Sequence, residues 1–138
     1  MSLFVLDTDT LTLLQRRLPI VCERAAAHAS ETAITVLTVE EQLSGWYALL
    51  RKAKKPDKII QAYRSLAENV RFLSQLRILD YDEPALRRYE DLKRQKLNIG
   101  KFDLRIAAVA LQHGATMVTC NVRHFQRVPG LQVEDWSK

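Results

Sequence analysis

Short apolar runs alternate along this chain with longer segments in which apolar residues recur every three or four positions. Residues 3–6 are apolar throughout, which is typical of a strand buried on both faces of a parallel sheet. Residues 57–75 instead carry apolar side chains at helical spacing, from Ile59 to Leu73. The pattern predicts strands at residues 3–6, 32–37, 78–79, 116–119 and 131–133. It predicts helices at residues 9–16, 20–29, 39–54, 57–75, 84–95 and 102–113, and one helical turn at residues 122–125.

The order of these elements predicts a fold of the α/β class. Strands that alternate with helices form a mostly parallel sheet, here of about four to five strands, between two helical layers in a three-layer α/β/α arrangement. The chain has 138 residues, which suffices for one domain with a core and is too short for two ordinary domains. Its sequence contains no Gly/Ser linker or internal repeat. We therefore expect residues 1–138 to form a single domain.

Polar side chains with metal-binding chemistry follow the predicted strands. Asp7 comes directly after residues 3–6, Glu41 follows the second predicted strand, and Asn121 follows the fourth. In parallel α/β sheets, ligands bind outside the carboxyl ends of the strands. Asp103 begins a predicted helix and reaches this edge only if that helix starts there. Mg²⁺ and Mn²⁺ prefer such oxygen ligands, so the pattern favours a divalent metal site.

Each of these acids also has a purely structural explanation. Asp7 or Thr8 could cap the first helix, and Thr38 with Glu41 matches a capping box in which Thr38 is the N-cap. Asp103 would be favoured by the positive end of its helix dipole. Caps do not require acids rather than Ser or Asn, however, whereas a metal site does.

Charge is unevenly distributed along the chain. The net charge is +5, but residues 1–50 carry three basic and six acidic side chains, while residues 51–138 carry eighteen basic and ten acidic ones. An acidic site beside a basic body suits a protein that holds metal and attracts a polyanion. A solvated helical surface rich in Lys and Arg is the alternative explanation.

Composition excludes several other classes of protein. The chain is 47% hydrophobic and 27% charged, the balance of a globular protein. No apolar stretch approaches the roughly 20 residues needed to cross a bilayer, and no secretory signal pattern is present, so we expect a cytoplasmic location. Cys22 and Cys120 lack metal-ligand spacing, which fits free thiols in a reducing compartment. The three histidines lack the spacing of a zinc site.

Four blocks of sequence together resemble the PIN domain, and within it the VapC-type toxins of prokaryotic toxin–antitoxin pairs. No single block is specific, but their order and spacing over the whole chain match the family. The blocks are Leu6-Asp7-Thr8-Asp9-Thr10-Leu11, Thr38-Val39-Glu40-Glu41 within residues 34–45, Gly100-Lys101-Phe102-Asp103 within residues 100–108, and Thr119-Cys120-Asn121-Val122 within residues 118–125.

The resemblance implies a Mg²⁺-dependent endoribonuclease, with Mn²⁺ also possible, that leaves 5′-phosphate and 3′-hydroxyl ends. Asp7, Glu41 and Asp103 correspond to the metal-binding acids. Glu41 aligns rather than Glu40 because the family acid lies four residues before the glycine that matches Gly45. Asn121 takes the fourth catalytic position with one negative charge fewer, where it ligates the metal or positions water. The hydroxyls expected to support the acids or the water belong to Thr8, Thr38 and Thr119.

The resemblance also implies partners. We expect an RNA substrate (tRNA, rRNA or mRNA), a homodimer, and a VapB-like antitoxin whose C-terminal segment covers the active site. Trp46 and Tyr47 could contact the dimer partner or the antitoxin, together with Leu43, Leu49 and Leu50, although core packing is the more ordinary role. The cations that could contact RNA phosphates are Arg16, Arg17, Lys52, Lys54, Lys55, Lys101, Arg105 and Arg123.

Two alternative functions stay open at this point. Asp7-Thr8-Asp9 also fits the opening motif of haloacid-dehalogenase-like phosphatases, with Asp7 as nucleophile and Asp9 as general acid, although the chain lacks the later Asp-Asp pair of that group. In the PIN interpretation, by contrast, Asp9 is an ordinary surface or capping acid. The second alternative is a non-catalytic RNA- or protein-binding module, which the uncharged Asn121 would favour.

Overall fold

A five-stranded parallel sheet forms the centre of the molecule. The computed structural model describes residues 2–138, and its strands lie in the order β3-β2-β1-β4-β5 with every neighbouring pair parallel. This arrangement confirms the predicted α/β class and the predicted size of the sheet. The strands are β1 Phe4–Leu6, β2 Thr32–Thr35, β3 Arg77–Leu79, β4 Thr116–Val118 and β5 Gln132–Glu134.

Every predicted helix is present, and most helices begin and end within two residues of the predicted bounds. No helix within residues 2–138 combines the length and the apolar content needed to cross a membrane. The helices are α1 Thr8–Gln15, α2 Pro19–Ala27, α3 Val36–Lys52, α4 Pro56–Ser74, α5 Glu83–Arg94, α6 Lys101–Gln112 and α7 Val122–Phe125, with a short 3-10 helix at Ala29–Glu31.

The start of α3 differs most from the prediction. Thr35, not Thr38, is the N-cap, and its hydroxyl oxygen accepts a hydrogen bond from the backbone N–H of Thr38 at 3.3 Å. The capping box of Thr38 and Glu41 is therefore wrong. β-branched residues in 32–36 favour a strand by propensity, but tertiary packing turns the chain earlier and buries Leu37 in the core. Thr38 lies in the first turn of α3 instead.

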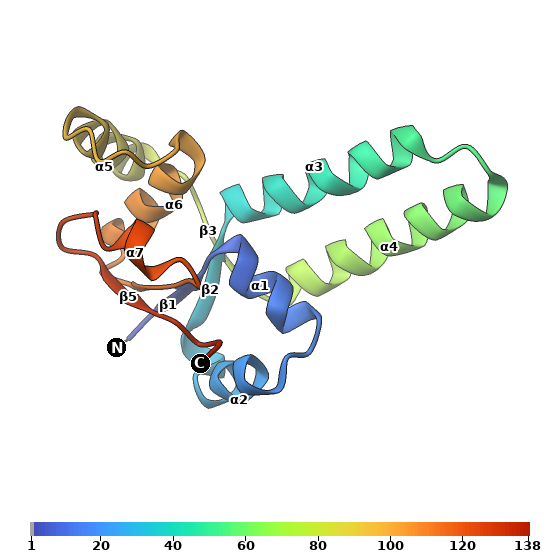
Figure 1. Cartoon of the computed structure of the whole chain (residues 1–138), viewed down its shortest axis with the longest axis horizontal. Helices are drawn as coiled ribbons and strands as arrows, with labels where there is room; N and C mark the ends of the chain where they lie inside the picture. The colour runs from blue at the N-terminus through green and yellow to red at the C-terminus, as the bar shows by residue number, and fades with distance from the viewer. Residues whose placement is uncertain (1) are drawn as a thin grey trace.

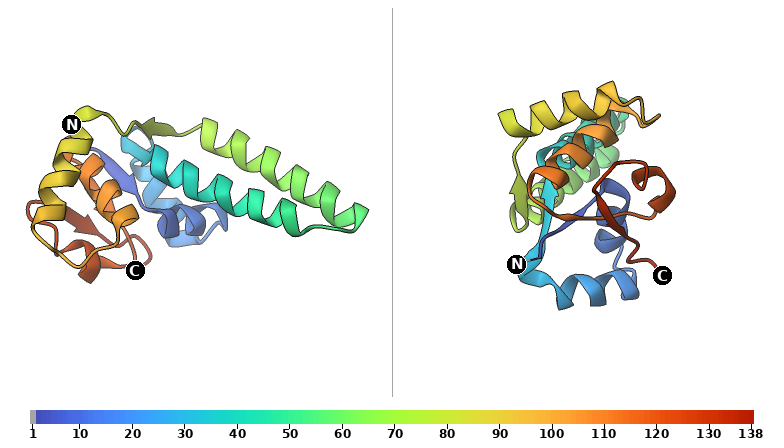
Figure 2. Two further views of the ribbon diagram at one scale, coloured as in Figure 1. Left: turned by 90° about the horizontal axis from the view of Figure 1, so that it is seen from above. Right: turned by 90° about the vertical axis from the view of Figure 1, so that its left-hand side faces the viewer.

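The two faces of the sheet carry separate apolar clusters. Val5 packs with residues of α5 and α6 on one face, whereas Phe4 and Leu6 pack with residues of α1, α2 and the end of α4 on the other. Side chains of successive strand residues point to opposite faces, so one continuous apolar run fills both clusters. Figures 1 and 2 show these helical layers on the two sides of the sheet.

Helices α3 and α4 form a long antiparallel hairpin that extends away from the sheet (Figures 1 and 2). The sheet-proximal parts of the hairpin join the core, through the buried Leu37 and Leu73 and the partly buried Val39 and Phe72. Along its length the hairpin also exposes apolar side chains, among them Tyr47, Leu49, Ile60, Tyr63 and Val70. We call these two helices and their turn the arm.

Parallel pairing brings the carboxyl ends of β1, β2 and β4 to one edge of the sheet. The backbone N–H of Asp7 extends the β1–β4 pairing by donating to the carbonyl oxygen of Val118 at 3.0 Å. The Thr10 hydroxyl donates to the same oxygen at 3.2 Å. These bonds fix the start of α1 beside the end of β4.

Candidate active site

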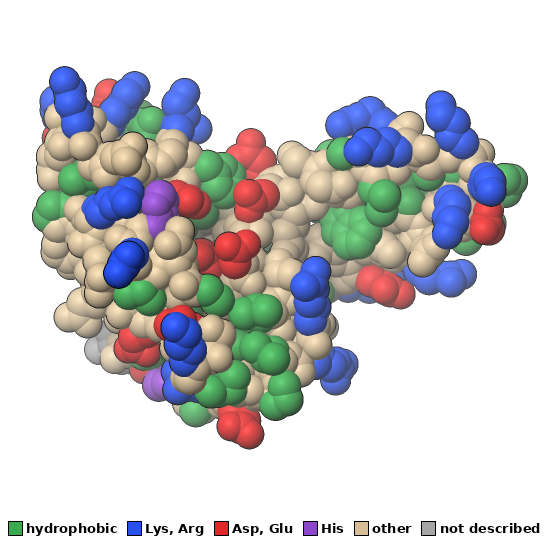
Figure 3. Space-filling view, in the orientation of Figure 1, with side chains coloured by type: hydrophobic (Ala, Val, Ile, Leu, Met, Phe, Trp, Pro, Cys, Tyr) green, Lys and Arg blue, Asp and Glu red, His purple; other side chains and the backbone are tan. Residues whose placement is uncertain are grey.

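A small cavity of about 180 Å³ lies at this edge of the sheet. It brings together all four residues predicted to be catalytic, which come from four different segments of the chain. We call it the acidic cavity, and Figure 3 shows acidic side chains gathered in the hollow between the body of the protein and the arm. The cavity is lined by Asp7, Thr8, Asp9, Glu41, Asp103, Asn121 and Phe125.

Asp7 is the most firmly held of these acids. It is only 6% exposed, and it caps α1 by accepting a hydrogen bond on Oδ1 from the N–H of Thr10 at 2.8 Å. Burial raises the pKa of the Asp7 carboxyl, although hydrogen bonds from Thr119 and Thr10 act in the opposite direction. The negative charge of Asp9 raises it further. A cation in the cavity would favour the ionised form of Asp7.

Glu41 reaches the cavity from the second turn of α3. The α1 and α3 helices are tied together beside it by the hydroxyls of Thr8 and Thr38, whose oxygens lie 3.2 Å apart. Thr38 is fully buried, so this contact holds the two helices in a fixed relation. The two threonines therefore position the elements that carry Asp7 and Glu41.

Asp103 lies in the first turn of α6, and this helix does begin at the edge where the other acids lie. One of its oxygens, Oδ2, is 3.2 Å from Nε2 of His124 in α7. Asn121 immediately precedes α7, and its backbone N–H donates to the buried hydroxyl of Thr119 at 3.0 Å. Thr119 thus contacts both Asp7 and the backbone of Asn121.

The donor set fits a hard divalent cation. Four carboxylates and one amide line the cavity, and no Lys or Arg side chain lines it to neutralise them. The acids are nevertheless spread around the walls, and no three His, Cys, Asp or Glu side chains within residues 2–138 are grouped as a ready-made metal cage. Mg²⁺ is usually held through one or two carboxylates while it keeps several waters, so a spread set of this kind suits it.

The predicted RNA-binding cations lie in different surroundings. Arg105 packs between the rings of Tyr81 and Tyr89, with its guanidinium carbon 5.9 Å and 5.1 Å from the two ring centres. Arg16 lines a hollow beside the acidic cavity, and Arg17 lines the next hollow along. The remaining cations are exposed on the arm, at the start of α6 and on α7, and are Lys52, Lys54, Lys55, Lys101 and Arg123.

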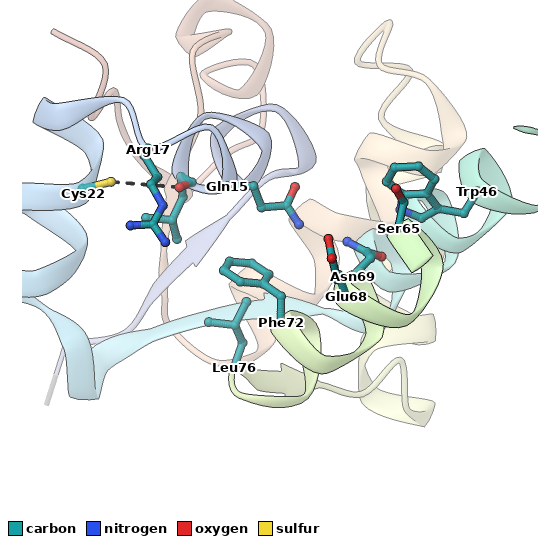
Figure 4. Close-up of a pocket in the computed structure, with 10 residues that line it drawn as sticks. Gln15, Arg17, Cys22, Trp46, Ser65, Glu68, Asn69, Phe72 and Leu76 are labelled. Carbon is teal, nitrogen blue, oxygen red and sulfur yellow. Dashed lines mark hydrogen bonds between the residues drawn. The ribbon is translucent and has the colours of Figure 1, made fainter. Parts of the chain in front are cut away.

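Two adjoining hollows of about 540 and 520 Å³ run from the acidic cavity between α1 and the arm. The first shares Thr8 and Glu41 with the cavity, and both hollows are lined by Gln15, Trp46 and Asn69. We call them together the arm groove. Figure 4 shows the hollow farther from the acidic cavity, with Phe72 between Leu76 and the polar side chains of Gln15 and Asn69.

An amide cluster forms the middle of the arm groove. Gln15 and Gln42 exchange two hydrogen bonds of 3.0 and 3.1 Å, and Asn69 donates to Oε1 of Gln42 at 2.8 Å. These bonds join α1, α3 and α4. Asn69 is only 8% exposed, and its own Oδ1 accepts no hydrogen bond within the described chain.

Three residues of the site had no role in the PIN interpretation of the sequence. Asp9 lines the cavity although that interpretation made it an ordinary surface or capping acid, and its position two residues after Asp7 was the available signal. Phe125 also lines the cavity, and His124 contacts Asp103. Neither contact could be inferred from spacing, because α6 and α7 meet only in the folded chain.

Comparisons with known proteins agree with this fold. Residues 4–131 match the PIN domain family, and the chain belongs to that family. It is 32% identical to the tRNA(fMet)-specific endonuclease VapC of Salmonella typhimurium, over 96% of this chain and 97% of the relative. It is 34% identical to the protein of the same name from Shigella flexneri, over 97% and 98%.

Solved structures of VapBC complexes also contain chains that are similar to this one. The DNA-bound VapBC complex from Salmonella typhimurium contains a chain that matches with a TM-score of 0.80 at 30% identity, covering 99% of both chains. VapBC-1 from nontypeable Haemophilus influenzae matches with a TM-score of 0.75 at 27% identity, again over 99% of both. The PIN resemblance read from the four sequence blocks is therefore confirmed.

The burial of Asp7 predicts that replacing it with asparagine stabilises the protein, whereas most substitutions of buried residues destabilise a fold. Between the unfolded pKa of 3.8 and the raised folded pKa, the folded protein binds more protons than the unfolded chain, so stability falls as pH rises through this window. Asp7→Asn keeps an N-capping side chain and removes the buried charge. In metal-free buffer near neutral pH, we expect it to raise the melting temperature by roughly 4 °C, which corresponds to about 1 kcal/mol.

Thermal unfolding from about pH 4 to about pH 8 in the presence of a chelator measures this difference. The gap between Asp7→Asn and wild type should widen as pH rises. The exposed Glu23→Gln on α2 is the matched control and should leave the melting temperature unchanged. An Asp7→Asn protein less stable than wild type at neutral pH would contradict the prediction.

Proposed function

We propose that the protein is a metal-dependent endoribonuclease and the toxin of a toxin–antitoxin pair, acting on RNA in the cytoplasm. The observation that carries the proposal is the convergence of Asp7, Glu41 and Asp103 from three separate elements on one cavity. The names of the relatives support the reaction class, since those proteins are described as endonucleases and ribonucleases named VapC. The substrate class is RNA, and tRNA is the first to test.

The metal would be held by Asp7, Glu41 and Asp103, with Mg²⁺ as the expected ion and Mn²⁺ as a substitute. When bound, a divalent cation supplies positive charge to a phosphodiester and makes a nearby water more acidic. Asn121 offers a neutral amide oxygen at the fourth position. Asp9 adds a carboxylate to the same cavity, and so replaces the charge that an acid at position 121 would provide.

The protein's own side chains orient the reaction. Asp7 cannot rotate freely, because the N–H of Thr10 holds its Oδ1 and the surrounding atoms bury it. Thr119 fixes the adjoining backbone of Asn121 at the far wall. Arg16, in the neighbouring hollow, is placed to bind an RNA phosphate beside the acids. Preorganised groups of this kind act on the transition state without having to move.

The site favours hydrolysis by water over a phospho-aspartate reaction. A haloacid-dehalogenase-like enzyme would need a lysine beside the nucleophile, and no lysine lines the acidic cavity. Asp7 also accepts the capping hydrogen bond from Thr10, which reduces its nucleophilicity. Covalent labelling of Asp7 by a phosphoryl donor would contradict this conclusion and support the phosphatase alternative.

Cleavage of RNA should depend on the acids that line the cavity. Purified protein, free of any partner, is incubated with total cellular RNA in Mg²⁺, in Mn²⁺ and in EDTA. We expect discrete metal-dependent fragments, and a loss of more than about 100-fold in Asp7→Asn and in Asp103→Asn, since even residues that only support metal ligands change activity by about 10- to 100-fold.

Glu23→Gln is again the control and should cut at the wild-type rate. Cleavage by Asp7→Asn at that rate would show that the site is wrongly assigned. A folded wild-type protein that binds RNA but does not cut it under any of these conditions would instead support the non-catalytic binding module.

If the Asp9 carboxylate replaces the charge missing at Asn121, substitutions at these two positions should change metal affinity in opposite directions. Asp9→Asn removes a charge from the cavity and should weaken Mn²⁺ binding by roughly tenfold, while Asn121→Asp should strengthen it by a similar factor. Calorimetric titration of each variant with Mn²⁺ measures both effects. Equal affinities for all three proteins would mean that neither side chain faces the ion.

The two solved structures compared above are VapBC complexes, which supports a VapB-like antitoxin as the partner of this chain. We infer that a segment of that antitoxin lies in the arm groove and extends over the acidic cavity, because the two share Thr8 and Glu41. The protein is also proposed to be a homodimer. A second copy would cover the exposed apolar face of α4 formed by Ile60, Tyr63 and Val70.

Trp46 should therefore contribute to antitoxin binding and not to catalysis. It lines both hollows of the arm groove, and buried aromatic anchors often cost more than about 2 kcal/mol when truncated. We expect Trp46→Ala to weaken antitoxin binding by roughly 30-fold while cleavage by the free protein is retained. Tyr47→Ala is the matched control, because Tyr47 neighbours Trp46 on α3 and lines neither hollow.

Surface plasmon resonance with immobilised antitoxin measures the affinities of wild type and the two variants. Equal losses in Trp46→Ala and Tyr47→Ala would place the partner on another face of the arm.

A further inference from the structure

His124 lies behind the acidic cavity, and neither the PIN resemblance nor the proposed mechanism gives it a role. Its side chain is 20% exposed, and its Nε2 atom is shielded from solvent. The ring stands edge-on to Phe125, with 5.3 Å between the ring centres. The group that approaches Nε2 is the carboxylate of Asp103, whose Oδ2 is 3.2 Å away.

This contact joins two elements that each bring a donor to the cavity. Asp103 belongs to the first turn of α6, and His124 belongs to α7, which begins directly after Asn121. The distance is that of a hydrogen bond, but the atoms are not aligned as one, and Nε2 has no other partner among the described residues. Hydrogen bonds in active sites often tighten into line only when the site is occupied.

We propose that His124 is a positioning residue that orients Asp103 for metal binding. Nε2–H donates to Oδ2 and leaves Oδ1 of the same carboxylate for the cation. A carboxylate has about four acceptor sites on two oxygens, so it can accept this bond and still bind a metal. Partners of this kind fix the orientation of metal ligands and commonly change metal affinity by about 10- to 100-fold.

His124 acts through Asp103 and not as a ligand. It does not line the cavity, whereas Asp103 and Phe125 do. The hard cations suited to this site also prefer oxygen to imidazole nitrogen. The role requires only a neutral side chain that carries an N–H donor at the right distance. Glutamine satisfies that requirement, and phenylalanine fills similar space without a donor.

This inference rests on the proposed metal site, and Mn²⁺ binding without RNA tests it. Calorimetry compares wild type, His124→Phe and His124→Gln, and thermal unfolding shows that each variant is folded. We expect His124→Phe to raise the dissociation constant for Mn²⁺ by about 10- to 100-fold and His124→Gln to stay within about threefold of wild type. His113→Gln, at the exposed end of α6, is the control and should bind as wild type.

Two outcomes would overturn the role of His124. One is wild-type affinity in His124→Phe, and the other is an equal loss in the Phe and Gln variants, which would indicate packing rather than hydrogen bonding. If His124→Phe does not fold, His124→Leu takes its place as the variant without a donor. Failure of the proposed function looks different, because wild type itself would then bind no Mn²⁺.

Discussion

The site depends on one electrostatic constraint, the burial of Asp7 beside other acids. An ionised carboxylate with little solvent around it is unfavourable unless hydrogen bonds or a cation compensate for the lost hydration. Here the N–H of Thr10 and the side chain of Thr119 supply part of the compensation, and no cationic side chain lines the cavity. The remaining imbalance is one that a bound divalent cation would relieve.

Contacts elsewhere in the fold keep the negatively charged side chains of the cavity close together. Pairing of β1 with β4 fixes Asp7 at the sheet edge through the carbonyl of Val118, and the buried Thr38 hydroxyl holds α3 against α1. Each contact restricts how far the acids can move apart to relieve their repulsion. A site that is suboptimal for stability but well placed for binding is a common feature of enzymes, and perturbed pKa values mark such positions.

The sequence predicted the sheet and the meeting of Asp7, Glu41 and Asn121 at one edge because both follow from local rules. Apolar runs that end in carboxylates identify strands and the edge of a parallel sheet, and the helical period of residues 57–75 identified α4 nearly to its ends. The start of α3 was missed, since burial of Leu37 overrides the β propensity of its neighbours. The His124 contact to Asp103 and the extension of the arm depend on how distant elements pack, which spacing alone does not encode.

The geometry of the arm links partner binding to catalysis without requiring any change of shape. The arm groove and the acidic cavity share Thr8 and Glu41, so the two are one continuous surface. A peptide that follows the apolar wall of the groove arrives at the acids, where a basic side chain would satisfy the same unbalanced charge that favours a metal. A metal ion and a basic side chain of the partner would then compete for one set of carboxylates, and the bound partner would also block the approach of RNA. Occlusion of the cavity by a bound partner would therefore be enough to silence the enzyme, with no change in the enzyme's own shape.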